Sequence, residues 1–233
     1  MSDIKESIIE YIRKNRVSSV EVADALGKSG VIDGFQPMVA RKHVVGEVKY
    51  IYGHTKSNWP IHEQGEKVSE GGVLFVDTFE CHNHAAFGDI VAKYFILYKS
   101  YEGIIVNGLM RDAHGIIKND FPVWCQGVTP LGCYNRMVEP SEEIKKQAEQ
   151  RRSEIEGGVM VADDSGVTLI SKDLLTKETL DRLHFIETQE DIWYYCLDTL
   201  KWSTYKTICL KDYLNDSGVL PEYLQQKLKE REL

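Results

Sequence analysis

The adjacent residues Arg111 and Asp112 carry the clearest chemical signal in this chain. They follow residues 103–107, an apolar run with β-branched side chains that predicts a short buried strand. A guanidinium can bind a carboxylate through two parallel hydrogen bonds. A carboxylate offers the hard oxygen ligand that Mg²⁺ or Mn²⁺ prefers. The pair therefore predicts a site for a small acid that also chelates a divalent metal.

A second motif, Gly88-Asp89, opens a segment over 89–100 whose pattern is helical. A glycine in front of a helix leaves the first backbone N–H groups, those of residues 90–92, free to bind an anion, and the helix dipole adds to the attraction. If the helix lies beside the strand, both motifs share one pocket. Asp89 is then placed to orient or deprotonate a metal-bound water.

These groups favour one kind of reaction. A metal that chelates a 2-oxoacid polarises its carbonyl, so an enolate that forms at the neighbouring carbon is stabilised. This favours cleavage of the adjacent C–C bond, by retro-aldol reaction or by decarboxylation. The plainer alternatives are that Arg111-Asp112 is a surface ion pair or a helix start, and that Asp89 is an N-terminal helix acid.

Composition narrows the class of protein. The 233 residues carry a formal net charge of −8 and are 42% hydrophobic, which suits a packed domain and argues against broad nucleic-acid binding. No apolar run is long enough to span a membrane, and the charged N-terminus does not resemble a secretory signal. The cysteines are odd in number and lack CxxC spacing, which indicates free thiols in a reducing cytoplasm.

Hydrophobic patterning predicts an α/β core followed by a more helical region. The first part has alternating strands and helices, preceded by two helices and a loop. The expected helices are 2–15, a second one opened by the capping box Ser18-x-x-Glu21, 89–100 and 113–119; the expected strands are 44–52, 73–77, 103–107 and 121–125; the expected loop is 27–37.

The character of the sequence changes after Pro140. A charged helix is expected over 141–156, and then a hairpin of two apolar strands, 159–162 and 167–170. From Lys172 onward the pattern is helical. We therefore expect a domain over 1–171, with a helical insertion near 141–156, and a helical C-terminal extension over 172–233.

Two further motifs allow more than one interpretation. Cys81-His82-Asn83-His84 contains zinc-ligand types, but their spacing matches no common structural zinc site; His82 or His84 could instead line the pocket entrance. The segment Asp163–Gly166 resembles half a calcium loop, but no ligand-rich continuation with a glutamate follows. We expect it to be the turn of the hairpin.

Five short motifs occur together in the order found in one protein family. The chain resembles the family of regulator of ribonuclease activity A, which includes 4-hydroxy-4-methyl-2-oxoglutarate aldolase and oxaloacetate decarboxylase. The resemblance spans roughly residues 18–171. The motifs that carry it are Asp24–Gly27, Gly88–Val91, Gly108-x-x-Arg111-Asp112, Phe121-Pro122-Val123 and Ala162-Asp163-Asp164-x-Gly166-Val167.

The resemblance implies a swivelling β/β/α core, like that of phosphohistidine domains, in a homotrimer or a dimer of trimers with sites at subunit interfaces. It implies that Arg111 binds the substrate carboxylate and that Asp112 holds the metal, Mg²⁺ or Mn²⁺. It further implies that the loop of Gly88, Asp89, Ile90 and Val91 contacts pyruvate. Asp89 falls where the aldolases of the family place a water-orienting acid.

The chain also departs from the family pattern. An acid commonly stands three residues after Asp112, where this chain has Gly115. The family aldolases use a glutamate from a neighbouring subunit, for which only Glu187 and Glu190 offer positional matches. The family's usual strand and Pro-Gly-Asp turn are not recognisable between Pro130 and Gly157.

The leading hypothesis is a metal-dependent lyase that cleaves a C–C bond of a small 2-oxoacid and releases pyruvate. The alternative is a non-catalytic protein that regulates a ribonuclease by binding it, since members of the family do so and the acidic charge suits a basic partner. Methyl transfer is a third possibility that the sequence disfavours, because no glycine-rich strand–turn–helix fingerprint for an adenosyl cofactor is visible.

Overall fold

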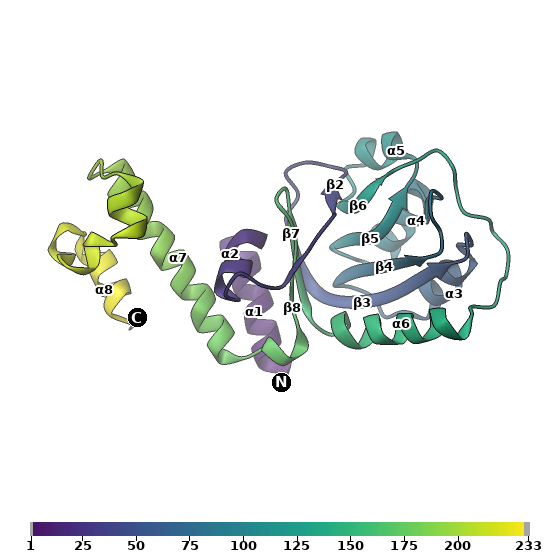
Figure 1. The fold of residues 1–233 in the computed structure, drawn as a ribbon, viewed down its shortest axis with the longest axis horizontal. Coiled ribbons are helices and arrows are strands. Elements are labelled where there is room, and N and C mark those ends of the chain that lie inside the picture. The colour runs from purple at the N-terminus through teal and green to yellow at the C-terminus, as the bar shows by residue number, and fades with distance from the viewer. Residues whose placement is uncertain (1, 231–233) are drawn as a thin grey trace. The chain divides into compact units, whose positions relative to one another are not determined.

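The computed structural model describes residues 2–230, which form two compact units that divide after Thr176. The first unit contains a sheet with the strand order β1-β8-β7-β3-β4-β5-β6-β2 (Figure 1). Its strands are β1 (Val31–Ile32), β2 (Gln36–Pro37), β3 (Val44–His54), β4 (Val73–Phe79), β5 (Gly103–Met110), β6 (Val123–Val128), β7 (Val159–Asp163) and β8 (Gly166–Ile170). Its α-helices are α1 (Ser2–Asn15), α2 (Ser19–Ala25), α3 (Trp59–Lys67), α4 (Asp89–Lys93), α5 (Ala113–Lys118) and α6 (Glu142–Ile155).

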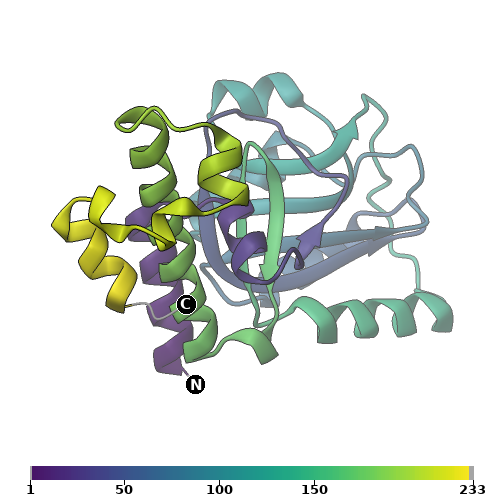
Figure 2. The same ribbon diagram turned by 60° about the vertical axis from the view of Figure 1, so that its left-hand side comes forward.

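The long strand β3 belongs to two differently built parts of the sheet. Residues 44–47 pair antiparallel with β7, whereas residues 48–54 pair parallel with β4. Strands β4, β5 and β6 continue the parallel part. The hairpin β7–β8 therefore lies against the beginning of β3, as both ribbon views show (Figures 1 and 2).

Two hydrophobic clusters cover the two faces of the sheet. On one face, Ile61 of α3, Ala92 of α4 and Ile116 of α5 pack against Val76 and Val106. The cluster on the other face joins the sheet to α6 and the hairpin through a set of larger side chains. Its members include Tyr50, Phe75, Ile105, Trp124, Ile155 and Met160. Because both faces are covered, the central strands are almost continuously apolar, as is typical of parallel sheets.

The predicted α/β class is confirmed, as are the hairpin, the charged helix and the capping box at Ser18. Two expectations were wrong in detail, and one helix was not predicted. The expected loop over 27–37 contains the edge strands β1 and β2, and α3 follows β3 where no element was expected. The expected helix 89–100 is α-helical only to Lys93 and continues as a π-helix over Tyr94–Tyr98.

The second unit begins at Lys177 and is helical, within the region in which a helical pattern was expected from Lys172 onward. It comprises α7 (Lys177–Asp198), α8 (Glu222–Glu230) and, between them, a π-helical turn and two 3₁₀ turns. A small core holds these elements together, and the indole N–H of Trp193 donates to the Tyr213 hydroxyl at 3.2 Å. The buried members of this core are Ile192, Cys196, Tyr213, Leu220 and Leu224.

A buried carboxylate in the middle of the sheet is satisfied by side chains from three neighbouring elements. Asp77 of β4 accepts the Tyr50 hydroxyl at 2.8 Å and the Asn107 amide at 2.6 Å, and Arg151 of α6 approaches at 3.4 Å. Burial, together with the negative charge of Asp77, raises the pKa of Tyr50 far above its usual value, so Tyr50 always donates.

We expect Tyr50→Phe to lower the free energy of unfolding by about 1–3 kcal/mol, because the buried Asp77 carboxylate loses one donor. Urea unfolding followed by circular dichroism measures the change. The control is Tyr205→Phe, since the Tyr205 side chain is exposed. Equal unfolding midpoints for the two variants would show that the hydroxyl of Tyr50 contributes nothing.

Candidate active site

The end of β5 and the segment before α4 lie side by side. Ala86 N–H donates to the Leu109 carbonyl at 2.8 Å, and Arg111 N–H donates to the Phe87 carbonyl at 3.1 Å. Residues 85–87 therefore extend the sheet locally and bring Gly88 next to Arg111-Asp112. This is the convergence that the sequence predicted for the two motifs.

The Asp112 carboxylate occupies the space in which a side chain at position 88 would begin. A Cβ atom placed on Gly88 would lie 1.9 Å from Asp112 Oδ2 and 3.1 Å from Arg111 Cγ. The shorter distance is far below van der Waals contact, so a side chain at position 88 would displace the half-exposed Asp112 carboxylate. Glycine at this position leaves room for the carboxylate where it now lies.

A third segment, which the sequence did not single out, lies against Arg111. A Cβ atom on Gly132 would lie 2.3 Å from Arg111 Nη1, so the guanidinium lies directly against the backbone of Gly132. Residues 131–133 are fixed in turn by Ala85, whose N–H donates to Leu131 and whose carbonyl accepts from Cys133. Gly132 lies far from both motifs in the sequence, and no local pattern marks it.

Asp89 lies on the other side of this group, against α5. A Cβ atom on Gly115 would lie 2.2 Å from Asp89 Oδ2. The glycine at the position where the family pattern commonly has an acid therefore leaves the space that the Asp89 carboxylate fills.

Asp112 stands at the start of α5 without capping the helix. Its backbone is left-handed, with φ 56° and ψ 36°, at the start of α5, and its side chain makes no capping hydrogen bond there. Its nearest charged partner is Arg111, whose Nε lies 3.4 Å from Asp112 Oδ2. Both side chains are about half exposed, 46% each, so a small molecule can reach them.

The anion-binding backbone is smaller than the sequence suggested. Ala92 N–H donates to the Gly88 carbonyl at 3.1 Å, because it forms the first α-helical hydrogen bond of α4. Ala92 is therefore excluded from the expected group over residues 90–92. Ile90 is 81% exposed and Val91 is partly buried, so the start of α4 faces outward.

The remaining residues named from the sequence lie in other surroundings. His84 is buried against Tyr134, and its Nδ1 has no hydrogen-bond partner. Glu187 and Glu190 belong to α7 in the second unit. Among residues 2–230, no three His, Cys, Asp or Glu side chains are close enough together to form a metal-binding group.

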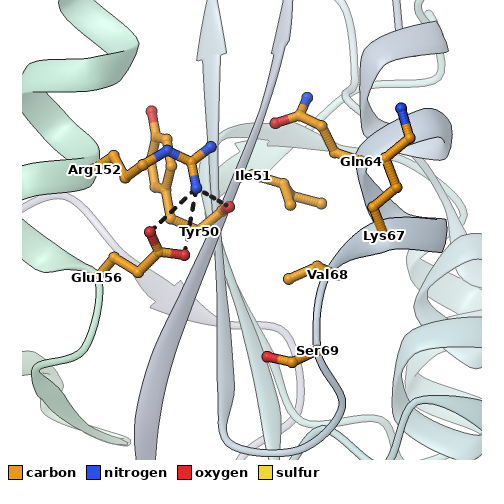
Figure 3. Close-up of a pocket in the computed structure, with 8 residues that line it drawn as sticks. All are labelled: Tyr50, Ile51, Gln64, Lys67, Val68, Ser69, Arg152 and Glu156. Atoms are coloured by element: carbon orange, nitrogen blue, oxygen red, sulfur yellow. Dashed lines mark hydrogen bonds and ion pairs between the residues drawn. The ribbon is translucent and has the colours of Figure 1, made fainter.

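The cavity drawn in Figure 3 lies elsewhere, between α3 and α6, and has a volume of about 330 Å³. Its charged side chains are engaged within the protein. Arg152 is bonded to Glu156 and to the Tyr50 carbonyl, and Lys67 pairs with Glu63 at 2.8 Å. Arg152 thereby attaches α6 to β3, which is a structural role.

Comparison with known proteins agrees with this architecture. The model of the RraA-like family (aldolase/RraA) matches residues 19–169. The crystal structure of RraAS2 from Streptomyces coelicolor, described as an unusual member of the RNase ES inhibitor RraA family, superposes with a TM-score of 0.60. It is 19% identical, and the superposition covers 82% of this chain and 96% of that one.

Two curated proteins are similar in sequence. Protein DlpA of Legionella pneumophila is 24% identical over 183 residues, which are 75% of this chain but 29% of DlpA. The chain therefore spans less than a third of that relative. A putative 4-hydroxy-4-methyl-2-oxoglutarate aldolase of Halalkalibacterium halodurans is 22% identical, with 72% of this chain and 80% of the aldolase aligned.

The fold and the matched residues define an α/β protein of the aldolase/RraA class. The chain belongs to the RraA-like family. The family includes both lyases and regulators of ribonucleases, so membership alone leaves both activities open. No helix in the described part of the chain is long and apolar enough to cross a membrane.

The close approach at Gly88 gives a testable coupling. Gly88→Ala should lower the free energy of unfolding by about 0.5–1.5 kcal/mol, because its Cβ displaces the half-exposed Asp112 carboxylate and forces that side chain off its preferred rotamer. The cost should be clearly smaller when Asp112→Ala is already present, a non-additivity that a double-mutant cycle of urea unfolding measures.

The matched control pairs Asp112→Ala with Gly218→Ala, since Gly218 belongs to the second unit. The changes in the free energy of unfolding caused by these two substitutions should be additive. If the changes caused by Gly88→Ala and Asp112→Ala are additive as well, the carboxylate does not occupy the space beside Gly88.

Proposed function

We infer that the protein is a divalent-metal-dependent lyase that cleaves a C–C bond of a small 2-oxoacid and releases pyruvate. The observation that carries this proposal is the convergence of Arg111, Asp112 and Asp89 around three glycines. Each of the three charged side chains lies against a glycine backbone, so cation and carboxylates are brought together where the surface is accessible.

Arg111 binds the substrate carboxylate in this proposal. Its guanidinium lies against the backbone of Gly132, and its planar fork of donors matches a carboxylate through two hydrogen bonds. The backbone at Gly88–Val91 contacts the same end of the substrate. Fixing this end leaves the carbonyl carbon and its neighbour oriented toward Asp112 and Asp89.

Asp112 would hold the metal, and its surroundings fit that role. Its carboxylate is half exposed and does not cap α5, so it remains available as a hard oxygen ligand. Mg²⁺ and Mn²⁺ accept such sites, because they retain several waters and take further oxygens from the substrate. When bound, the metal would polarise the oxoacid carbonyl and stabilise negative charge on its oxygen.

Asp89 acts as the proton-handling group. Its carboxylate fills the space beside Gly115, on the α5 side of the same group. From there it orients a water and accepts or returns a proton as the C–C bond breaks.

We further propose that the protein works as a homotrimer or a dimer of trimers with the site at a subunit interface. The supporting observation is an exposed apolar surface on α4 and the π-helix that follows it, next to the Gly88–Val91 loop. Its members are Ile90, Leu97 and Tyr98, which are 81%, 55% and 66% exposed. A second subunit that covers this surface would shield the bound oxoacid from bulk water.

The test is pyruvate release, coupled to lactate dehydrogenase, from oxaloacetate and from 4-hydroxy-4-methyl-2-oxoglutarate, with and without Mg²⁺ or Mn²⁺. Asp112→Asn should abolish the metal-dependent rate, because an amide replaces the charged ligand. Arg111→Lys should lower kcat/KM by about 10²-fold or more, since one point charge replaces two aligned hydrogen bonds.

Asp33→Asn is the control, because Asp33 is exposed and lies in the loop between β1 and β2. It should retain full activity. Full activity in Asp112→Asn, with an unchanged dependence on metal, would contradict the assignment of Asp112. No turnover by the wild-type protein on any 2-oxoacid would retire the lyase proposal.

A non-catalytic role in ribonuclease regulation is the second candidate, and the net charge of −8 is the observation in its favour. An acidic protein is attracted to a basic partner surface, and that attraction weakens with salt. Salt-sensitive inhibition of a ribonuclease that survives Asp112→Asn would support this candidate. Inhibition that is independent of salt concentration would contradict this candidate, because it would show that the acidic charge of the protein does not drive the binding.

A further inference from the structure

A cavity of about 460 Å³ lies at the carboxyl end of β3, beside the start of α3 and the segment that leads from β6 to α6. This segment is fixed next to α3 by two hydrogen bonds (Figure 1). Asn58 N–H donates to the Tyr134 carbonyl at 3.2 Å, and the Ser57 hydroxyl donates to the Arg136 carbonyl at 2.5 Å. The cavity is therefore enclosed by elements that contact each other directly.

Three aromatic side chains line this cavity, and contacts within the protein fix two of them. The ring centroid of Tyr52 lies 5.8 Å from that of Phe79 and 5.9 Å from that of His54. His54 is 1% exposed, whereas Trp59, at the start of α3, is 42% exposed. The cavity thus combines an ordered aromatic part with an indole that a small molecule can reach. The faces of such rings carry negative charge and attract cations.

The positively charged side chains that line the cavity already have acidic partners. Arg152 Nη1 lies 3.1 Å from Glu156 Oε2, and Lys67 Nζ lies 2.8 Å from Glu63 Oε1. Burial lowers the pKa of His54, so its ring is neutral near pH 7 and adds no positive charge. An anion that entered the cavity would therefore compete with carboxylates of the protein for both cations.

Glu139 is the acidic side chain of this cavity that remains available. It is exposed and, within residues 2–230, forms no ion pair. Its charge acts on Lys145 of α6, but Lys145 is bonded to Glu142 at 2.7 Å. The cavity therefore presents a carboxylate beside aromatic rings, with its own cations engaged.

We propose that this cavity binds an organic cation, a primary amine in its ammonium form on a small apolar body. The body packs against Tyr52 and Trp59, and the ammonium group binds the Glu139 carboxylate and the adjacent ring faces. The volume of the cavity lies within the range of roughly 300–1,000 Å³ that is usual for sites of small molecules.

This cavity is distinct from the candidate active site. Neither Arg111, Asp112 nor Asp89 lines it. Its wall includes residues 137–140 and part of α6, which belong to the stretch between Pro130 and Gly157 where the chain departs from the family pattern. Binding of an amine here is therefore independent of the proposed lyase function.

The experiment is isothermal titration calorimetry of the full chain with three probes that share one aromatic ring and differ in charge. The probes are 2-phenylethylamine, the neutral 2-phenylethanol and the anionic 3-phenylpropionate. The amine should bind about tenfold more tightly than the alcohol, because only the amine gains the cation–π and carboxylate interactions. The acid should bind least. No binding of the amine, equal binding of the amine and the alcohol, or tighter binding of the acid would each overturn the proposal.

Substitutions assign the binding to this cavity. Trp59→Leu should weaken binding of the amine about tenfold, and Glu139→Gln about two- to fivefold, since the carboxylate is exposed and screened. Glu139→Lys should abolish binding, and because it changes an exposed side chain its result does not depend on the packing of α3.

Two control variants should bind the amine like the wild type. Glu10→Gln removes an exposed carboxylate on α1, outside the cavity, and Asp112→Asn alters the candidate active site alone. Unchanged affinity in Glu139→Lys would overturn the proposal. Loss of binding in Asp112→Asn would also overturn it, because the amine would then occupy the candidate active site.

Discussion

The fold depends on how closely β3 approaches the beginning of β4. A Cβ atom on Gly46 would lie 2.9 Å from the Gly72 Cα, and one on Gly72 would lie 2.2 Å from the Glu47 carbonyl oxygen. This contact lies where β3 leaves the antiparallel pairing with β7 and begins its parallel pairing with β4. Two glycines at this close approach thus allow the single strand β3 to belong to both the antiparallel and the parallel part of the sheet.

The parallel pairing that begins at this point determines where the candidate site forms. Once β4, β5 and β6 run parallel to β3, their carboxyl ends meet at one edge, and the connections that leave them are forced together there. The turn at Cys81, the α4 start and the segment at Gly132 all belong to such connections. Buried groups behind this edge, such as Asp77 with Tyr50, hold the strands in register beneath it.

The sequence allowed the core strands and the pairing of Gly88-Asp89 with Arg111-Asp112 to be predicted, because apolar periodicity and adjacent charges are local signals. The contact between Gly132 and Arg111 could not be predicted, since it arises only when the strand ends meet. The strands β1 and β2 have two residues each, too few to show a period. The π-helix after Lys93 also lacks a local signal, because its composition is that of an ordinary helix.

The left-handed backbone of Asp112 has a consequence for how this protein can change. A non-glycine residue in that region raises the energy of the folded chain by about 1 kcal/mol, which glycine would avoid and asparagine would reduce. Stability alone would therefore favour glycine or asparagine at this position. Under the proposed lyase function the aspartate is kept for its carboxylate, and a copy of this chain that no longer needed that function would lose Asp112 early while keeping its fold.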